Sequence, residues 1–121
     1  PGKDDFLESI MDLKVSSHFL ITRKGTLIQF VSTDKRAWHA GVSAYKGREN
    51  CNDFSIGIEL EGCDDEEFEQ PQYNSLSRLI NFLCIDLQIN KQNIVGHADI
   101  APGRKSDPGP LFDWTLLQSM L

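Results

Sequence analysis

The strongest constraint on the fold is a change of hydrophobic period between residues 55 and 88. The segment SIGIELE (55–61) alternates strictly, so that Ile56, Ile58 and Leu60 share one face of a predicted strand. After Pro71, which suits a first helical position, apolar residues recur at helical spacing and predict an amphipathic helix over 71–88. These residues are Tyr73, Leu76, Ile80, Leu83 and Leu87. A half-apolar strand followed by such a helix predicts a sheet covered by helices.

The remaining elements are shorter. Segments 15–22 and 26–31 are rich in β-branched and aromatic residues, and they predict a hairpin in which Gly25 takes a positive φ. Residues 93–95 predict a short strand, and Asp113 is placed to cap a last helix over 114–121. Residues 34–53 are expected to form a structured loop. The predicted class is α/β of the mixed α+β kind, with a mixed central sheet flanked by helices in a single domain over 1–121.

Charge and cysteine content exclude several functions. The net charge is −6 and the pI is about 4.9, which argues against a nucleic-acid groove. No apolar run approaches the roughly 20 residues that span a bilayer, so no membrane partner is expected. Cys51, Cys63 and Cys84 are odd in number and show no CxxC spacing. Free thiols in a reducing compartment are therefore expected rather than a disulfide framework.

The segment VGHADIAPGRKSDPGP (95–110) holds the densest set of chemically active side chains. His97 follows the predicted strand, and Asp107 lies ten residues later, beyond two turns that contain proline. Both residue types bind zinc, and a catalytic zinc takes three protein ligands and keeps one open position. The spacing alone also fits a hydrogen-bonded loop, which is the commoner meaning of such a pair.

Two further side chains would complete a metal-assisted hydrolase. Lys105 lies two residues before Asp107, so in an extended segment both project to the same side, and its ammonium would stabilise a developing oxyanion. Glu59, on the polar face of its strand, would take a proton from the attacking water. Lys105 alone is most often a surface lysine. Glu59 is more informative, because a carboxylate in the middle of an apolar strand needs either an interaction partner or a functional role.

Four stretches carry a resemblance to a known family. They are VSSHFLI (15–21), DKRAWHAGV (34–42), CNDFSIGIELEG (51–62) and GHADIAPGRKSDPGPLFDW (96–114). With them, residues 15–114 resemble the zinc-dependent N-acetylmuramoyl-L-alanine amidases. The resemblance is greatest to the cytoplasmic bacterial branch, which cleaves 1,6-anhydromuramyl peptides during cell-wall recycling. It implies a cytoplasmic protein, in agreement with the unpaired cysteines.

The resemblance implies a role for each matching residue. His97 and Asp107 match two zinc ligands, Lys105 matches the lysine that assists at the scissile carbonyl, and Glu59 matches the carboxylate that activates water. Trp38 and His39 match residues that line the substrate groove. The implied reaction is hydrolysis of the amide between the lactyl group of muramic acid and L-alanine of the stem peptide.

Departures from the family pattern concern the metal and the peptide. The first zinc histidine of the family lies on an early strand that has no counterpart in these 121 residues. We therefore expect that strand, and that ligand, to come from a segment outside them. His18 is a less favoured alternative ligand, because it matches a separate histidine of the VSSH motif. Asn50 stands where relatives often carry an arginine that holds the acidic stem peptide, and Lys14 where another basic residue is common, so peptide binding is expected to be weaker or differently arranged.

Two functions remain open from the sequence. One is a zinc amidase whose site is completed by the missing segment. The other is a muropeptide-binding module, as in the peptidoglycan recognition proteins that keep the groove and lose zinc ligands. Retention of the full set of Glu59, His97, Lys105 and Asp107 favours the enzyme. Little activity is expected of the 121 residues alone, because two protein ligands seldom hold zinc well against water.

Overall fold

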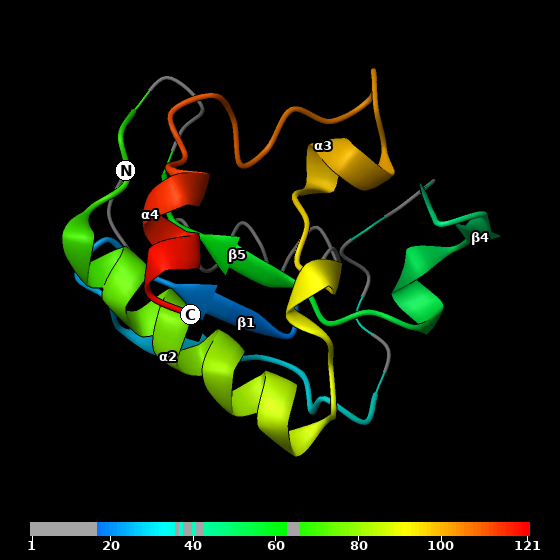
Figure 1. Cartoon of the computed structure of the whole chain (residues 1–121), viewed down its shortest axis with the longest axis horizontal. Helices are drawn as coiled ribbons and strands as arrows, with labels where there is room; N and C mark the ends of the chain where they lie inside the picture. Colours follow the sequence, from blue (N-terminus) through cyan, green and yellow to red (C-terminus); the bar gives the residue numbers. More distant parts are fainter. Residues whose placement is uncertain (1–16, 36, 38–39, 41–42, 63–65) are drawn as a thin grey trace.

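A computed structural model describes residues 17–35, 37, 40, 43–62 and 66–121. Its main sheet has the order β2-β1-β5. The central strand β1 (Phe19–Ile21) pairs antiparallel with β2 (Leu27–Gln29) and parallel with β5 (Ile58–Leu60) (Figure 1). A separate antiparallel pair joins β3 (Ala44–Tyr45) to β4 (Arg48–Glu49). The mixed sheet and the predicted hairpin are confirmed, with Gly25 at φ +85° in the turn.

The longest helix is α2 (Gln70–Asp86), which runs along one face of the sheet with α4 (Trp114–Ser119) beside it (Figure 1). The predicted helix over 71–88 is confirmed with slightly different ends. Glu69 is the N-cap and forms a capping box with Gln72, so Pro71 is the second helical residue rather than the first. Asp113 caps α4 as predicted, since its side chain accepts a hydrogen bond from the Leu116 N–H.

The other helical segments of the residues described are short: η1 (Cys51–Asp53), η2 (Lys91–Asn93) and α3 (His97–Ile100). The strand predicted at 93–95 is wrong. Asn93 closes η2, and although Ile94 has extended dihedral angles, no strand of the described residues pairs with this segment. A β-strand is defined by ladder hydrogen bonds to a neighbour, and extended backbone without that neighbour remains a loop.

The core forms between the sheet and α2. Strand alternation directs Phe19 and Ile21 of β1, with Ile58 and Leu60 of β5, toward the apolar face of the helix. The buried members of this cluster are Phe19, Ile21, Tyr73, Leu76, Leu79, Ile80, Leu83, Phe112 and Leu117. The same alternation places Leu20 and Glu59, which are direct neighbours in the β1–β5 register, on the opposite face. The sheet therefore separates an apolar layer from a face that carries a carboxylate.

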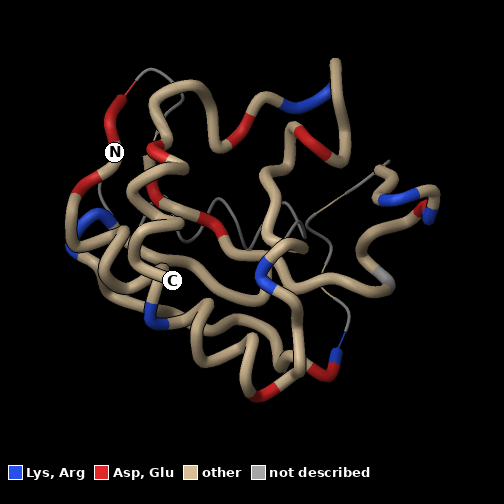
Figure 2. Tube along the Cα trace, viewed as in Figure 1, with Lys and Arg blue, Asp and Glu red and all other residues tan. Residues whose placement is uncertain are grey.

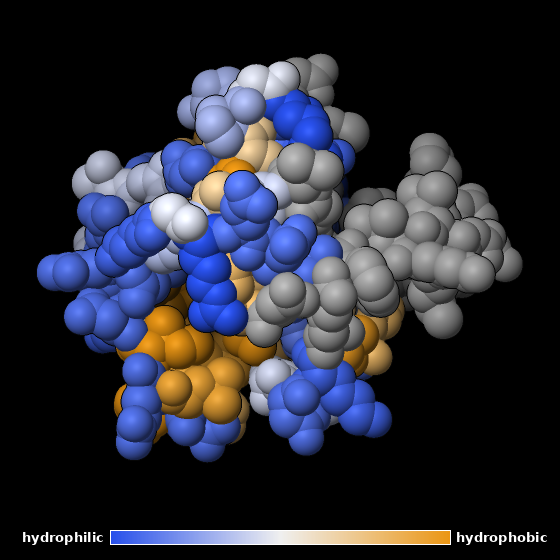
Figure 3. Space-filling model, turned by 90° about the vertical axis from the view of Figure 1, so that its right-hand side faces the viewer, coloured by the Kyte–Doolittle hydropathy of each residue, from blue (hydrophilic) through white to orange (hydrophobic). Residues whose placement is uncertain are grey.

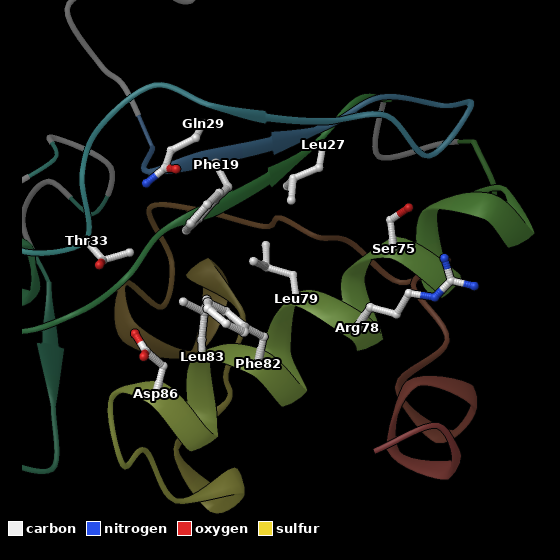
Figure 4. Close-up of a pocket in the computed structure, with 10 residues that line it drawn as sticks. All are labelled: Phe19, Leu27, Gln29, Thr33, Ser75, Arg78, Leu79, Phe82, Leu83 and Asp86. Carbon is white, nitrogen blue, oxygen red and sulfur yellow. The ribbon is translucent and has the colours of Figure 1, made fainter.

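Apolar surface remains accessible at several places. A groove of about 440 Å³ runs between β1, β2 and α2, where Phe19 faces Leu79 and Leu83 and polar Arg78 and Asp86 stand at its rim (Figure 4). A space-filling view shows apolar side chains that gather within a polar surround (Figure 3). No helix of the described part of the chain is long and apolar enough to cross a membrane.

Cys51 and Cys84 are free thiols, and Cys84 packs against the core as expected.

The hairpin turn at Gly25 yields a stability prediction. A Cβ at Gly25 would lie 2.7 Å from the Pro71 carbonyl oxygen, in addition to the unfavourable positive φ. We expect Gly25→Ala to lower the free energy of unfolding by about 2–4 kcal/mol, more than the 1–3 kcal/mol typical of left-handed strain alone. Gly47→Ala is the matched control, because Gly47 has φ +81° and no atom within 4 Å of the added Cβ. Urea unfolding of both variants measures the difference; equal losses would contradict a tight contact between the hairpin and α2.

Candidate functional site

His97 and Asp107 come together at the start of α3. Nδ1 of His97 lies 3.2 Å from Oδ2 of Asp107. The backbone closes the loop between them, because the Ala98 N–H donates to the Asp107 carbonyl at 2.9 Å. Gly96 permits this approach: a Cβ there would lie 2.7 Å from Cδ of Pro108. The ten-residue spacing seen in the sequence thus becomes a direct side-chain contact.

The imidazole of His97 lies between two hydrogen-bond acceptors. Its Nε2 is 2.9 Å from the Ala40 carbonyl oxygen, and its Nδ1 faces the Asp107 carboxylate. A neutral ring has only one N–H, so both contacts are satisfied only if a proton or another cation occupies the second nitrogen. The hydrogen bond to Asp107 accordingly raises the pKa of His97 above its ordinary value, and the same bond lowers the pKa of Asp107.

Glu59 approaches this pair from β5, on the sheet face opposite α2. Burial raises the pKa of the Glu59 carboxyl above its ordinary value, and the negative charge of Asp107 raises it further. The charges of His97 and Lys105 act in the opposite direction. A carboxylate with a raised pKa is a better proton acceptor at neutral pH than an ordinary glutamate.

Lys105 lies on the loop that follows α3. Figure 2 shows this loop carrying a basic segment between two acidic positions, which are Asp99 and Asp107 in the sequence. Backbone hydrogen bonds from Arg104 and Lys105 to the Ala101 carbonyl, at 3.1 and 3.0 Å, form the turn that holds the segment. Lys105 is near enough to Glu59, His97 and Asp107 to influence all three pKa values.

All four side chains line one cavity of about 1370 Å³. Its apolar wall comes from β5, α2 and the segment around Ile94, and its polar end holds Glu59, His97, Lys105 and Asp107. The β3–β4 pair borders the cavity through Tyr45, whose hydroxyl is 2.9 Å from Oδ1 of Asn93; Lys46 Nζ reaches the same oxygen at 3.1 Å. A large cavity with a few convergent polar groups is the usual form of a ligand site.

The His97–Asp107 pair fits a zinc ion in two respects. Zn–N and Zn–O bonds of about 2.0–2.2 Å at a tetrahedral angle separate neighbouring ligand atoms by about 3.3 Å, close to the 3.2 Å between Nδ1 and Oδ2. The Nε2–H of His97 donates to a backbone carbonyl, as the second ring nitrogen of zinc-binding histidines usually does. Among the residues that the structure describes, no group of three potential ligands converges, so this pair supplies two.

His18 does not fit the alternative role of a ligand. It is 1% exposed, and both ring nitrogens engage backbone groups: Nε2 lies 2.7 Å from the Lys35 carbonyl, and Nδ1 accepts from the Gly57 N–H at 3.1 Å. The ring therefore joins the loop after β2 to the residue before β5. This is a structural role, in which neither nitrogen is available to a metal.

The predicted substrate-binding residues are placed only in part. Lys14, Trp38 and His39 lie outside the described residues. Asn50 is exposed and takes a left-handed conformation (φ 57°) at the start of η1, next to the cavity-lining residues Cys51 and Asn52. Asparagine tolerates this conformation better than most residues.

Three residues that support His97 escaped the sequence analysis. The Ala40 carbonyl also accepts a hydrogen bond from NH2 of Arg104 at 2.6 Å, and the Ala40 N–H donates to Oδ1 of Asn52 at 2.8 Å. Alanine carries no side-chain chemistry that a motif could reveal, and its role here belongs to its backbone. Arg104 and Asn52 did lie within recognised stretches, but nothing in their spacing connects them to residue 40.

Comparison with known proteins places the chain in a family. The model of the N-acetylmuramoyl-L-alanine amidase family (Amidase_2) matches residues 3–110. The chain is 53% identical over 114 residues to the 1,6-anhydro-N-acetylmuramyl-L-alanine amidase AmpD of Escherichia coli, covering 94% of this chain and 62% of that protein. It is 49% identical to AmpD of Citrobacter freundii over all 121 residues, or 65% of that relative. The chain thus spans less than two thirds of the length of these relatives.

Solved structures agree with the sequence relatives. A crystal structure of an AmpD derivative superposes with a TM-score of 0.88 at 50% identity, covering 97% of this chain and 65% of that one. The amidase AmiD of E. coli, in complex with anhydro-N-acetylmuramic acid-L-Ala-D-γ-Glu-L-Lys, superposes with a TM-score of 0.91 at 38% identity, covering 99% and 53%. On the family match, the relatives and the shared fold, the chain belongs to the N-acetylmuramoyl-L-alanine amidase family.

Proposed function

We propose that the protein hydrolyses the amide between N-acetyl(anhydro)muramic acid and the L-alanine of a stem peptide, in cytoplasmic cell-wall recycling. The observation that carries the proposal is the convergence of the His97–Asp107 pair with Glu59 and Lys105 at the polar end of one cavity. The names of the relatives support the substrate, as does the anhydromuropeptide bound in the AmiD structure.

His97 and Asp107 would hold Zn²⁺ through Nδ1 and a carboxylate oxygen. Zinc bound there would act as a Lewis acid and make a water molecule acidic enough to attack near neutral pH. The Ala40 carbonyl keeps the Nε2 proton of His97 in place and so directs the lone pair of Nδ1 toward Asp107. The chain thereby sets the protonation state that a histidine ligand requires.

The remaining chemistry belongs to Glu59 and Lys105. Glu59 accepts the proton of the attacking water, for which its raised pKa suits it, and returns a proton to the departing amine of L-alanine. The ammonium of Lys105 donates hydrogen bonds to the scissile carbonyl oxygen, on which negative charge develops during attack. The apolar side chains that line the cavity lower the local dielectric constant, which strengthens these interactions.

We further propose that a segment outside these 121 residues completes the site. Two protein ligands are fewer than a catalytic zinc takes, and the described part of the chain provides two. In that part, no strand pairs with the edge of β5 remote from β1, and the cavity beside it has an apolar wall. A further strand there would satisfy the free backbone groups of β5 and bring a third ligand beside His97.

A non-catalytic muropeptide-binding module is the second candidate. The presence of two ligands, and no third, among the described residues favours it for the 121 residues alone. The two functions separate when a protein that includes the additional segment is compared with the 121-residue chain. Zinc content by elemental analysis and hydrolysis of an anhydromuramyl peptide are measured for each. Peptide binding without hydrolysis in both forms would favour the binding module.

Asp107→Ala tests the metal ligand. In the protein as expressed from its own gene, we expect zinc affinity to fall by at least 100-fold, since a charged ligand is lost and His97 loses its partner. A competition assay with a chromogenic chelator gives the dissociation constant. Asp86→Ala removes an exposed carboxylate at the end of α2 and should leave zinc affinity unchanged. Unchanged zinc binding in Asp107→Ala would remove Asp107 from the site.

Glu59→Gln tests both the role of Glu59 as the base and its raised pKa. We expect the variant to keep zinc and lose turnover, because the amide cannot accept a proton. Since the folded pKa of Glu59 is raised, its ionised form costs stability at pH values above that pKa. The metal-free variant should therefore be more stable than the parent chain at pH 8, and the advantage should vanish as the pH falls toward about 4, the pKa of an unfolded glutamate. Thermal unfolding at both pH values tests this; a constant difference would contradict the raised pKa.

Lys105→Ala tests the oxyanion contact. Loss of one such donor typically costs about 100-fold or more in kcat, and we expect that loss with little change in zinc content. Lys24→Ala, which removes an exposed lysine from the β1–β2 turn, is the charge-matched control. Equal kcat values for the two variants would make Lys105 an ordinary surface lysine.

A further inference from the structure

The polar contacts of Ala40 are unusual for an alanine in a loop. Its side chain and backbone are 0% exposed, and three different residues bind its peptide groups. The carbonyl oxygen accepts from Arg104 and from His97, at 2.6 and 2.9 Å, and the N–H donates to Asn52 at 2.8 Å. Ala40 is thus fixed at both ends of its backbone.

These bonds connect Ala40 with two other parts of the chain. Asn52 belongs to η1, whereas His97 and Arg104 belong to α3 and the loop that follows it. Arg104 and Asn52 both contact Ala40, and the Ala40 carbonyl in turn contacts Nε2 of His97. A displacement of the Ala40 carbonyl would therefore weaken its hydrogen bond to Nε2 of His97 and free the imidazole to turn.

A carbonyl oxygen has two lone pairs and can accept from both donors at once. The guanidinium bond is charge-assisted and short, so it is the stronger of the two. It holds the oxygen in a direction that leaves the second lone pair for the Nε2–H of His97. On the other side of the residue, Asn52 is only 6% exposed and accepts the Ala40 N–H, which holds the backbone of Ala40 at the peptide plane that precedes the carbonyl.

We propose that Arg104 and Asn52 are positioning residues that act through the backbone of Ala40 to fix the orientation and Nε2 protonation of His97. Neither side chain is assigned contact with the substrate or the metal. Their effect on zinc rests on the function proposed above, whereas their effect on the imidazole does not. While Arg104 and Asn52 hold the backbone of Ala40, Nδ1 of His97 remains directed at Asp107, which is the arrangement that a zinc ligand needs.

The first test observes the imidazole in the metal-free 121-residue chain. A hydrogen-bonded Nε2–H exchanges slowly with water and gives a separate NMR signal on the labelled histidine ring. We expect Arg104→Ala and Asn52→Ala each to speed its exchange at least tenfold. Arg78→Ala, which removes an exposed arginine from α2, should leave it unchanged. Unaltered exchange in both Arg104→Ala and Asn52→Ala would overturn the proposal. Because Arg104 is exposed, its variants keep the test decisive even if Asn52→Ala fails to fold.

The second test measures zinc affinity for the same substitutions in the protein that includes the additional segment. Loss of a partner behind a ligand typically weakens metal binding by about 10–100-fold, and we expect this for Arg104→Ala. Arg104→Lys keeps the charge and one donor, so it should recover part of the loss. Tighter zinc binding in Arg104→Ala would show that Arg104 acts only by repelling the cation, and would overturn the proposal. If the protein that includes the additional segment binds no zinc, the proposed metal fails, while the exchange measurement still decides the role of Arg104 and Asn52.

Discussion

Parallel pairing of β1 with β5 aligns Phe19 with Ile58 and Leu20 with Glu59. Because side chains alternate along a strand, this register sends the apolar pair toward α2 and the carboxylate to the other face. A shift by one residue would bury Glu59 against the helix and expose Ile58. The burial of the core and the position of the candidate base therefore depend on the same three-residue ladder.

Loop residues then place further charged side chains beside Glu59, on the face of the sheet opposite α2. His97 starts α3, Asp107 returns to it across a turn, and the Ala40 carbonyl fixes the far side of the ring. A neutral imidazole has one N–H, so a ring that lies between two acceptors needs a proton or a metal ion on its second nitrogen. The raised pKa of His97 and the fit of the pair to zinc are two expressions of that one arrangement.

Sequence patterns predicted the elements with strong local signals. The alternation in SIGIELE, the apolar spacing after Pro71 and the capping position of Asp113 all correspond to observed elements. The strand at 93–95 was wrong because pairing is a property of two segments, and the sequence of one cannot supply its neighbour. Ala40 was missed for a related reason: its contribution is a carbonyl group, which every residue carries. The spacing of His97 and Asp107 alone did not decide between a metal site and a hydrogen-bonded loop, and the resemblance to the amidases supplied the roles of the site residues.

The central claim is that Nδ1 of His97 and the carboxylate of Asp107 form a ready pair for zinc. The most direct test is a zinc titration of the protein that includes the additional segment, followed by ¹⁵N NMR of its histidine rings. The account predicts that zinc shifts the Nδ1 signal of His97, leaves its Nε2–H bonded, and does not affect His18, whose two nitrogens already bind backbone groups. Zinc that binds without changing the His97 signals, or that binds through Nε2, would contradict it.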